Sequence, residues 1–198
     1  LNLTGEAIFK KQLYQCMIGQ ALEMKSNIET RRSTNQFGTL IWQFNEIWPT
    51  GGWGSIEYGT PVYGQVIGGR WKPLQYLLKK SIYQDVMATC GQYGQCYVKN
   101  DGITAFEGNV VVSEIAFADG SVNVLVNMNV TMEAGAGVTQ FFSLPSSSIN
   151  GSTSIVRAVV TDLSGNVKSD NVIPFNVPAN MDLLAANIQY TVANAPNA

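Results

Sequence analysis

The apolar positions at the start of the chain recur at the spacing of an α-helix. Residues 6–34 carry Lys, Gln and Glu between apolar residues that follow the 3.6-residue period, namely Ile8, Leu13, Met17, Ala21, Leu22 and Ile28. Thr4 is placed to cap this helix. Phe9, Tyr14 and Ile18 widen its apolar side. The pattern therefore predicts a helix that packs against a larger body.

A short apolar run follows at residues 40–44, closed by Pro49 and the Gly51-Gly52 pair. It predicts a buried strand that runs into a loop. Residues 53–69 predict a long glycine-rich loop, and residues 70–82 a second short helix with Pro73 in its first turn. A helix, a buried strand and another helix form the alternation of a parallel α/β barrel or sheet.

Beyond Tyr83 the pattern becomes that of an all-β fold. Runs rich in β-branched and aromatic residues, separated by turn signals, predict strands at residues 110–117, 122–130, 140–144, 154–162 and 172–177. Within the second run, strict alternation predicts one common face for Val122, Val124, Val126, Met128 and Val130. We expect an immunoglobulin-like β-sandwich over residues 83–183, with residues 184–198 as a tail or the start of another β domain.

Composition narrows the functional classes. The 198 residues are 45% hydrophobic, carry a net charge of −2 and form no basic stripe, which argues against nucleic acid as a partner. No apolar run approaches the roughly 18 residues that a membrane span requires. Because the chain has no histidine, Ser-His-Asp and Cys-His catalysis are excluded within it. Its three cysteines do not match a zinc pattern, so we expect no metal and no cofactor.

Three tryptophans lie within twelve residues, beside an amide and a carboxylate. Trp42, Trp48 and Trp53 offer aromatic faces that can stack on a pyranose, while Asn45 and Glu46 can bind its hydroxyls. The pattern indicates a sugar-binding site. The alternative is a core strand whose tryptophans only fill space.

The segments YQCMIGQALEMK, GTLIWQFNEIWPTGGWGSIEYG and GGRWKPLQYLLKK resemble the end of the catalytic domain of β-mannosidases in glycoside hydrolase family 2. This resemblance implies that residues 1–82 are the C-terminal portion of a (β/α)8 TIM barrel, comprising helix seven, strand eight and helix eight. The α/β portion would be followed by the immunoglobulin-like β-sandwich. The family acts as a retaining exo-glycosidase on terminal β-mannose.

The resemblance also implies site residues. Trp42 would stack on the sugar in the −1 subsite, with Trp48, Trp53 and Glu57 lining the mouth of the pocket. Where the family has Asn-Asp, this chain has Asn45-Glu46, which leaves the role of Glu46 open. Residues 60–68 are interposed relative to the family, and we expect them to form a loop over the pocket entrance.

The resemblance places both catalytic glutamates outside this chain. The family carries them on barrel strands four and seven, so no catalytic residue is expected here. The chain would be a fragment or one product of processing. Its partners would then be an N-terminal chain of the same precursor, carrying strands one to seven, and an oligosaccharide substrate.

Three other interpretations remain open. Asn45-Glu46 also imitates the Asn-Glu pair that carries the acid/base at the end of strand four in related barrels, although several further βα units should then follow. The chain could instead be a non-catalytic carbohydrate-binding or structural protein derived from the same barrel. A free-standing immunoglobulin-like adhesion module would leave the tryptophan-rich stretch without a role.

The positions of several asparagine and cysteine residues indicate the cellular compartment of the protein. Asn2, Asn129 and Asn150 begin N-glycosylation sequons, and Cys90 and Cys96 are spaced for a disulfide within the β region. Cys16 is predicted to be a buried free thiol. Together these features favour a secreted or lysosomal/vacuolar protein.

Overall fold

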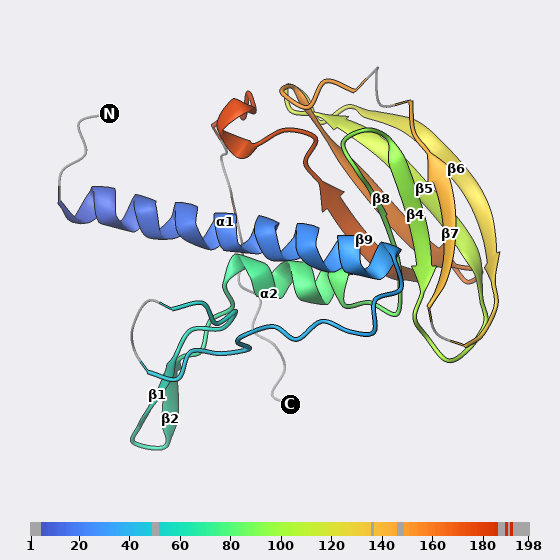
Figure 1. Cartoon of the computed structure of the whole chain (residues 1–198). Helices are drawn as coiled ribbons and strands as arrows, with labels where there is room; N and C mark the ends of the chain where they lie inside the picture. The colour runs from blue at the N-terminus through green and yellow to red at the C-terminus, as the bar shows by residue number, and fades with distance from the viewer. Residues whose placement is uncertain are drawn as a thin grey trace.

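The computed structural model describes residues 5–48, 52–135, 137–145 and 149–185, together with residues 189 and 191. A long helix, α1 (Glu6–Ser33), lies beside a shorter one, α2 (Pro73–Leu77), and the C-terminal end of α1 meets a β-sandwich (Figure 1). Across these ranges no helix combines the length and apolar character needed to span a membrane.

The two helices share a small apolar core. Pro73 occupies the first turn of α2, which continues into the π-helical turn η1 (Leu78–Ile82). The buried residues of this core are Ala21, Ile28, Leu74, Leu78 and Ile82. Gly5 is the N-cap residue of α1, and the predicted cap Thr4 lies outside the described residues. Cys16 was predicted to be buried, but it is exposed, as is every residue of α1 from Glu6 to Cys16.

The predicted strand at residues 40–44 is wrong. These residues form no strand, and Leu40, Trp42 and Phe44 are exposed. The only ladder contact near them is an isolated parallel bridge between Asn45 and Ile56. A strand needs backbone partners along its edges. Among the described residues only the Phe44 carbonyl oxygen finds backbone partners, the N–H groups of Ser55 and Ile56, so residues 40–44 do not form the strand that their sequence favours.

Residues 60–68 form a β-hairpin where a loop was predicted. Strands β1 (Gly59–Val62) and β2 (Gln65–Gly68) pair in antiparallel register, with Val62 opposite Gln65. The two turn residues between them, Tyr63 and Gly64, have φ angles of 48° and 80°. Two successive positive φ angles are those of a type I′ turn, whose twist matches paired strands. The hairpin projects away from both helices and the sandwich (Figure 1).

Two antiparallel sheets make up the sandwich. One contains β3 (Val86–Cys90), β4 (Gln95–Asn100) and β7 (Val138–Ser143), in the order β3-β4-β7. The other contains β5 (Phe106–Ala116), β6 (Val122–Met132), β8 (Ser154–Asp162) and β9 (Val167–Ile173), in the order β6-β5-β8-β9. Val98, Val110, Val112, Val156 and Val160 are fully buried between the sheets. The sequence pattern missed β3 and β4 and placed β9 several residues too late.

The predicted single face of β6 is interrupted by a bulge. Val126 pairs with Val112 and Val124 with Ser113, so Leu125 has no partner of its own. Beyond this extra residue the alternation reverses. Leu125 packs against the core, whereas Val122 and Val124 are exposed.

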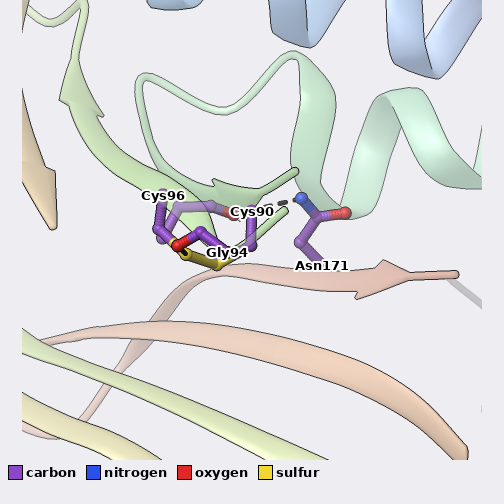
Figure 2. The surroundings of a disulfide bond; sticks show 5 residues. Cys90, Gly94, Cys96 and Asn171 are labelled. Carbon is purple, nitrogen blue, oxygen red and sulfur yellow. Dashed lines mark hydrogen bonds between the residues drawn. A yellow bond between two sulfur atoms is a disulfide. The ribbon is translucent and has the colours of Figure 1, made fainter. Parts of the chain in front are cut away.

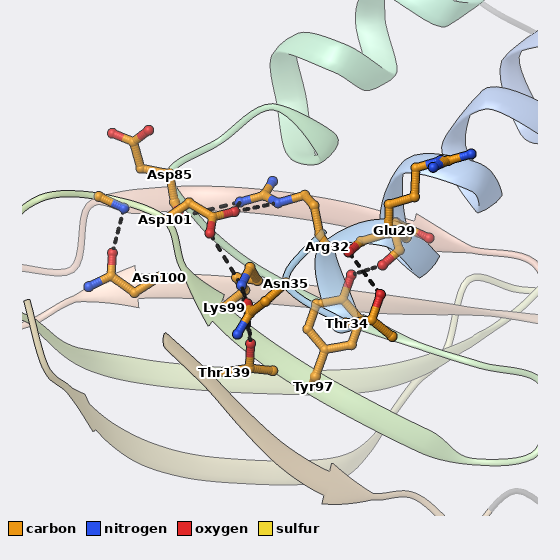
Figure 3. A network of polar contacts seen from close by, with 12 residues as sticks. Glu29, Arg32, Thr34, Asn35, Asp85, Tyr97, Lys99, Asn100, Asp101 and Thr139 are labelled. Atoms are coloured by element: carbon orange, nitrogen blue, oxygen red, sulfur yellow. Dashed lines mark hydrogen bonds and ion pairs between the residues drawn. The ribbon is translucent and has the colours of Figure 1, made fainter. Parts of the chain in front are cut away.

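Polar contacts join α1 to the sandwich (Figure 3). Arg32 donates from Nε to Asp101 Oδ2 at 2.8 Å, and from its two terminal nitrogens to the carbonyl oxygens of Ile82 and Gln84, each at 2.8 Å. The Tyr97 hydroxyl donates to the Glu29 carbonyl oxygen at 2.5 Å. Burial of Tyr97 raises the pKa of its phenol well above the usual range, with the nearby Glu29 carboxylate adding to the shift. These bonds fix the helix end against the β3–β4 side of the sandwich.

Candidate functional site

The tryptophan-rich segment is held on a small backbone framework. Glu46 N–H donates to the Ile56 carbonyl oxygen at 2.9 Å, and Ser55 N–H donates to the Phe44 carbonyl oxygen at 2.9 Å. Lys72 N–H in turn donates to the Ser55 carbonyl oxygen at 2.8 Å. Residues 44–46 are thereby fastened to residues 55–56, and these to the start of α2.

Glu46 lies inside this framework. Its residue is only 4% exposed, its Oε1 accepts the Gly54 N–H at 3.0 Å, and the same atom forms an ion pair with the Lys72 ammonium. Lys72 also donates to the Gly52 carbonyl oxygen at 3.1 Å. In this structure the Glu46 carboxylate is buried and paired within the protein, where it shapes the loop. Its binding of sugar hydroxyls stays a prediction.

A close approach explains a glycine at position 54. A Cβ atom there would lie 2.6 Å from the Asn45 carbonyl carbon and 2.6 Å from the Glu46 nitrogen. Only glycine lets residues 53–55 pass this close to residues 45–46. The Asn45 side chain contributes locally as well, since its Nδ2 donates to the Glu46 carbonyl oxygen at 2.9 Å.

All three tryptophans are turned outward. Trp42 is 74% exposed, Trp48 57% and Trp53 60%, so the alternative that they fill the core is wrong for this structure. The Trp53 carbonyl oxygen accepts a hydrogen bond from Gln20 Nε2 at 2.5 Å, which ties this loop to α1. The rings are available for stacking, although the structure does not gather them into one cavity.

Glu57 is separate from the tryptophans. It lines a groove of about 780 Å3 between α1 and α2, together with Arg70, Trp71 and Lys72. The Arg70 Nε lies 3.0 Å from each carboxylate oxygen of Glu57, and this contact raises the pKa of the guanidinium. The sequence interpretation missed Arg70 and Lys72. Their signal was two cations flanking Trp71 directly after the glycine pair.

Other predicted positions are placed as follows. Cys90 and Cys96 form a disulfide, with Cα atoms 4.0 Å apart on paired strands (Figure 2). Asn129 on β6 and Asn150 before β8 are exposed, whereas Asn2 lies outside the described residues. In the part of the chain that the structure describes, no three His, Cys, Asp or Glu side chains are grouped to hold a metal ion.

Known proteins were compared by sequence and by structure. No family model matches the chain. A β-mannosidase from Capra hircus is 36% identical over 81 residues, which cover 36% of this chain and 8% of that protein. β-Mannosidase A from Aspergillus oryzae is 33% identical over 93 residues, covering 44% of this chain and 9% of that protein. The chain thus matches only a small part of the length of these relatives.

Two solved structures share the fold of this chain. A β-D-mannosidase from Dictyoglomus thermophilum superposes with a TM-score of 0.61 at 21% identity, over 92% of this chain and 22% of that one. The exo-chitosanase CsxA from Amycolatopsis orientalis gives a TM-score of 0.60 at 17% identity, over 79% of this chain and 18% of that one. At these identities the likeness concerns the fold. Taken with the sequence matches, it shows that this chain resembles a fragment of a glycoside hydrolase family 2 β-mannosidase.

Proposed function

We propose that this chain is part of a retaining exo-glycosidase that removes terminal β-mannose from oligosaccharides, and that it supplies the sugar-stacking side of the active site. The observation that carries the proposal is the exposed Trp42 ring next to the framework built on Glu46. An exposed indole beside an ordered polar loop is suited to the apolar face of a pyranose. The sequence relatives supply mannose as the sugar.

Within this proposal the predicted residues have different roles. Trp42 stacks on the sugar in the −1 subsite, and Asn45, three residues later, is within the same segment. Glu46 and Lys72 act as positioning residues, because their buried ion pair fixes the loop that follows. In the assembled enzyme, Trp48, Trp53 and Glu57 would line the mouth of the pocket, and the β1–β2 hairpin would stand at its entrance.

The exposed apolar surface supports a partner that carries barrel strands one to seven. Large apolar residues are exposed along two segments, α1 and the stretch before Trp53, namely Phe9, Leu13, Tyr14, Phe37, Leu40, Trp42, Phe44 and Ile47. Soluble monomers rarely leave this many large apolar side chains bare within two short segments. A neighbouring parallel strand on each side would satisfy the backbone groups of residues 40–44 as strand eight.

The two catalytic glutamates belong, in this proposal, to that partner, which we assign to the N-terminal part of the same precursor. Retaining hydrolysis needs one carboxylate as nucleophile and one as acid/base, about 5–5.5 Å apart. Trp42 would favour the flattened, oxocarbenium-like ring of the transition state. Exposed sequons at Asn129 and Asn150 and the Cys90–Cys96 disulfide support a secreted or lysosomal/vacuolar location.

A chimera tests the proposal. The matching stretch of Aspergillus oryzae β-mannosidase A is replaced by that of this chain, and hydrolysis of 4-nitrophenyl β-D-mannopyranoside is measured. We expect an active enzyme in which Trp42→Ala lowers kcat/KM at least about tenfold, since lost stacking costs about 1.4 kcal/mol or more in the transition state. Trp42→Phe should keep part of that activity.

Lys80→Ala, at an exposed position of η1 to which the proposal gives no role, serves as the control and should leave kcat/KM unchanged. Melting temperatures of all variants separate loss of folding from loss of stacking. A folded chimera that binds mannose but does not hydrolyse the aryl mannoside would favour the alternative, a non-catalytic carbohydrate-binding protein. Unchanged kinetics in Trp42→Ala would contradict the role of the ring.

A further inference from the structure

We propose a second carbohydrate-binding site, in a groove between α1 and the tip of the β3–β4 hairpin. The groove has a volume of about 600 Å3 and is lined by Lys25, Glu29, Thr89, Tyr93, Gln95 and Phe141, among others. It shares no residue with the segment from Trp42 to Glu57. The inference therefore stands independently of the proposed glycosidase function.

One wall of the groove is pre-organised. Cys90 and Cys96 are direct partners in the antiparallel register, and their disulfide closes the hairpin immediately before its turn (Figure 2). The turn is further held by Gly91 N–H donating to the Gln95 carbonyl oxygen at 2.7 Å and by Leu144 N–H donating to the Gly94 carbonyl oxygen at 2.7 Å. A wall tied in this way loses little conformational entropy when a ligand binds.

Buried polar groups form the base. Lys25 is 4% exposed, and its Nζ donates to Glu29 Oε1 at 2.5 Å. The same carboxylate oxygen accepts Asn171 Nδ2 at 2.8 Å. The Thr89 hydroxyl, on a residue that is also 4% exposed, has no hydrogen-bond partner among the described residues. The hydroxyl oxygen is enclosed in the unliganded groove, and a buried hydroxyl without a partner costs free energy, so a ligand that reaches it by displacing a neighbouring side chain gains a hydrogen bond.

Two aromatic rings stand at the rim. Tyr93 at the hairpin turn and Phe141 on β7 are both exposed and both line the groove. Phe141 is held in place by an edge-to-face contact with Tyr97, whose ring centroid lies 6.4 Å away. Exposed, oriented rings beside amide and hydroxyl groups provide stacking on the apolar face of a sugar and hydrogen bonds to its hydroxyls.

The charges at the base of the groove indicate which class of ligand it binds. The ammonium of Lys25 is matched by the carboxylate of Glu29, so the base of the groove carries both signs and no excess of either. A phosphate or an ammonium group would have to displace one partner of this buried pair, which is costly. A neutral, polyhydroxylated ligand has no such cost. We therefore assign the groove to a neutral oligosaccharide.

The test titrates the full chain with β-1,4-mannotriose, cellotriose and the trimer of N-acetylglucosamine, using isothermal calorimetry and saturation-transfer NMR. We expect saturable binding of at least one sugar, with the affinity lowered about tenfold by the combined change Tyr93→Ala and Phe141→Ala, in line with the loss of two stacking contacts. Trp42→Ala, in the other candidate site, should leave this binding unchanged.

Thr89→Val separates a ligand role from a structural one. Valine has nearly the same shape and removes the unpartnered hydroxyl, so the melting temperature should stay the same or rise while sugar affinity falls. Absence of saturable binding for all three sugars would overturn the proposal. So would binding that Trp42→Ala abolishes while Tyr93→Ala with Phe141→Ala leaves it intact, and so would a preference for inorganic phosphate over every sugar.

Discussion

The carboxylate of Glu46 forms a buried ion pair with the ammonium of Lys72, 26 residues later in the chain. The side chains are 4% and 13% exposed, respectively. The pair connects the segment that carries the tryptophans to the start of α2. It lets a stretch without regular secondary structure keep a defined shape.

Glu46→Gln should therefore open the loop. Glutamine keeps the size of the side chain but leaves the buried Lys72 ammonium without an opposite charge, which we expect to cost about 3–5 kcal/mol. The measurement is amide hydrogen exchange at Ser55 and Ile56, whose N–H groups donate to the Phe44 carbonyl oxygen. Glu57→Gln is the matched control, because its partner Arg70 is exposed. Equal exchange in both variants would show that burial of the Glu46 pair is unimportant.

Tyr97→Phe tests the junction between α1 and the sandwich. The variant removes the hydrogen bond from the Tyr97 hydroxyl to the Glu29 carbonyl oxygen and should lower the free energy of unfolding by about 1–2 kcal/mol at neutral pH. Urea unfolding, monitored by circular dichroism, measures this free energy of unfolding. Tyr93→Phe, at an exposed position, should have no effect on this quantity.

The same tyrosine predicts an alkaline loss of stability. Because the folded pKa of Tyr97 is raised, the unfolded chain releases its proton first, near the ordinary tyrosine pKa of about 10. Stability conferred by the neutral phenol is complete below that pH and declines as the pH rises above it. Urea unfolding between neutral pH and pH 11 should show this decline in the wild type. An equal decline in Tyr97→Phe would assign the effect to other groups.

Asp170 predicts an acid-sensitive contact between β8 and β9. Arg157 donates to its two carboxylate oxygens at 2.7 Å and 2.8 Å, and these hydrogen bonds lower the Asp170 pKa below its usual range. A carboxylate with a lowered folded pKa stabilises the fold above its unfolded pKa of about 3.9, and that stability is lost as the pH falls through the folded value. Asp170→Asn should flatten the decline of the unfolding free energy below pH 4. A slope identical to that of the wild type would contradict the assignment.

Removing the disulfide should destabilise the β3–β4 hairpin. The paired variant Cys90→Ala with Cys96→Ala opens a short loop, since the cysteines are six positions apart, and should lower the unfolding free energy by about 2 kcal/mol. Thermal unfolding with and without dithiothreitol measures this loss. Cys16→Ser, at the exposed free cysteine, is the control and should unfold like the wild type under both conditions.

Some elements were determined by the sequence because their local pattern and tertiary environment agree. The helix expected at residues 6–34 is α1, Glu6–Ser33, and the strand expected at 154–162 is β8. Strands β3 and β4 escaped notice because Thr89, Lys99 and Asn100 are buried polar residues that interrupt the apolar pattern. Lys99, for example, donates to Asn35 and Thr139, which are distant in the chain, so local periodicity could not reveal why it is buried.

Only the tertiary structure decided the state of the candidate site. The strand preference of residues 40–44 requires neighbouring strands, and the described chain provides none beside them. The sequence placed Asn45-Glu46 in a sugar site, but only the fold brought Lys72 and the Gly54 N–H to the Glu46 carboxylate. Likewise, one extra residue at Leu125 reversed the alternation of β6. Side-chain type limits the possible chemistry, while long-range contacts fix which groups are buried, paired or exposed.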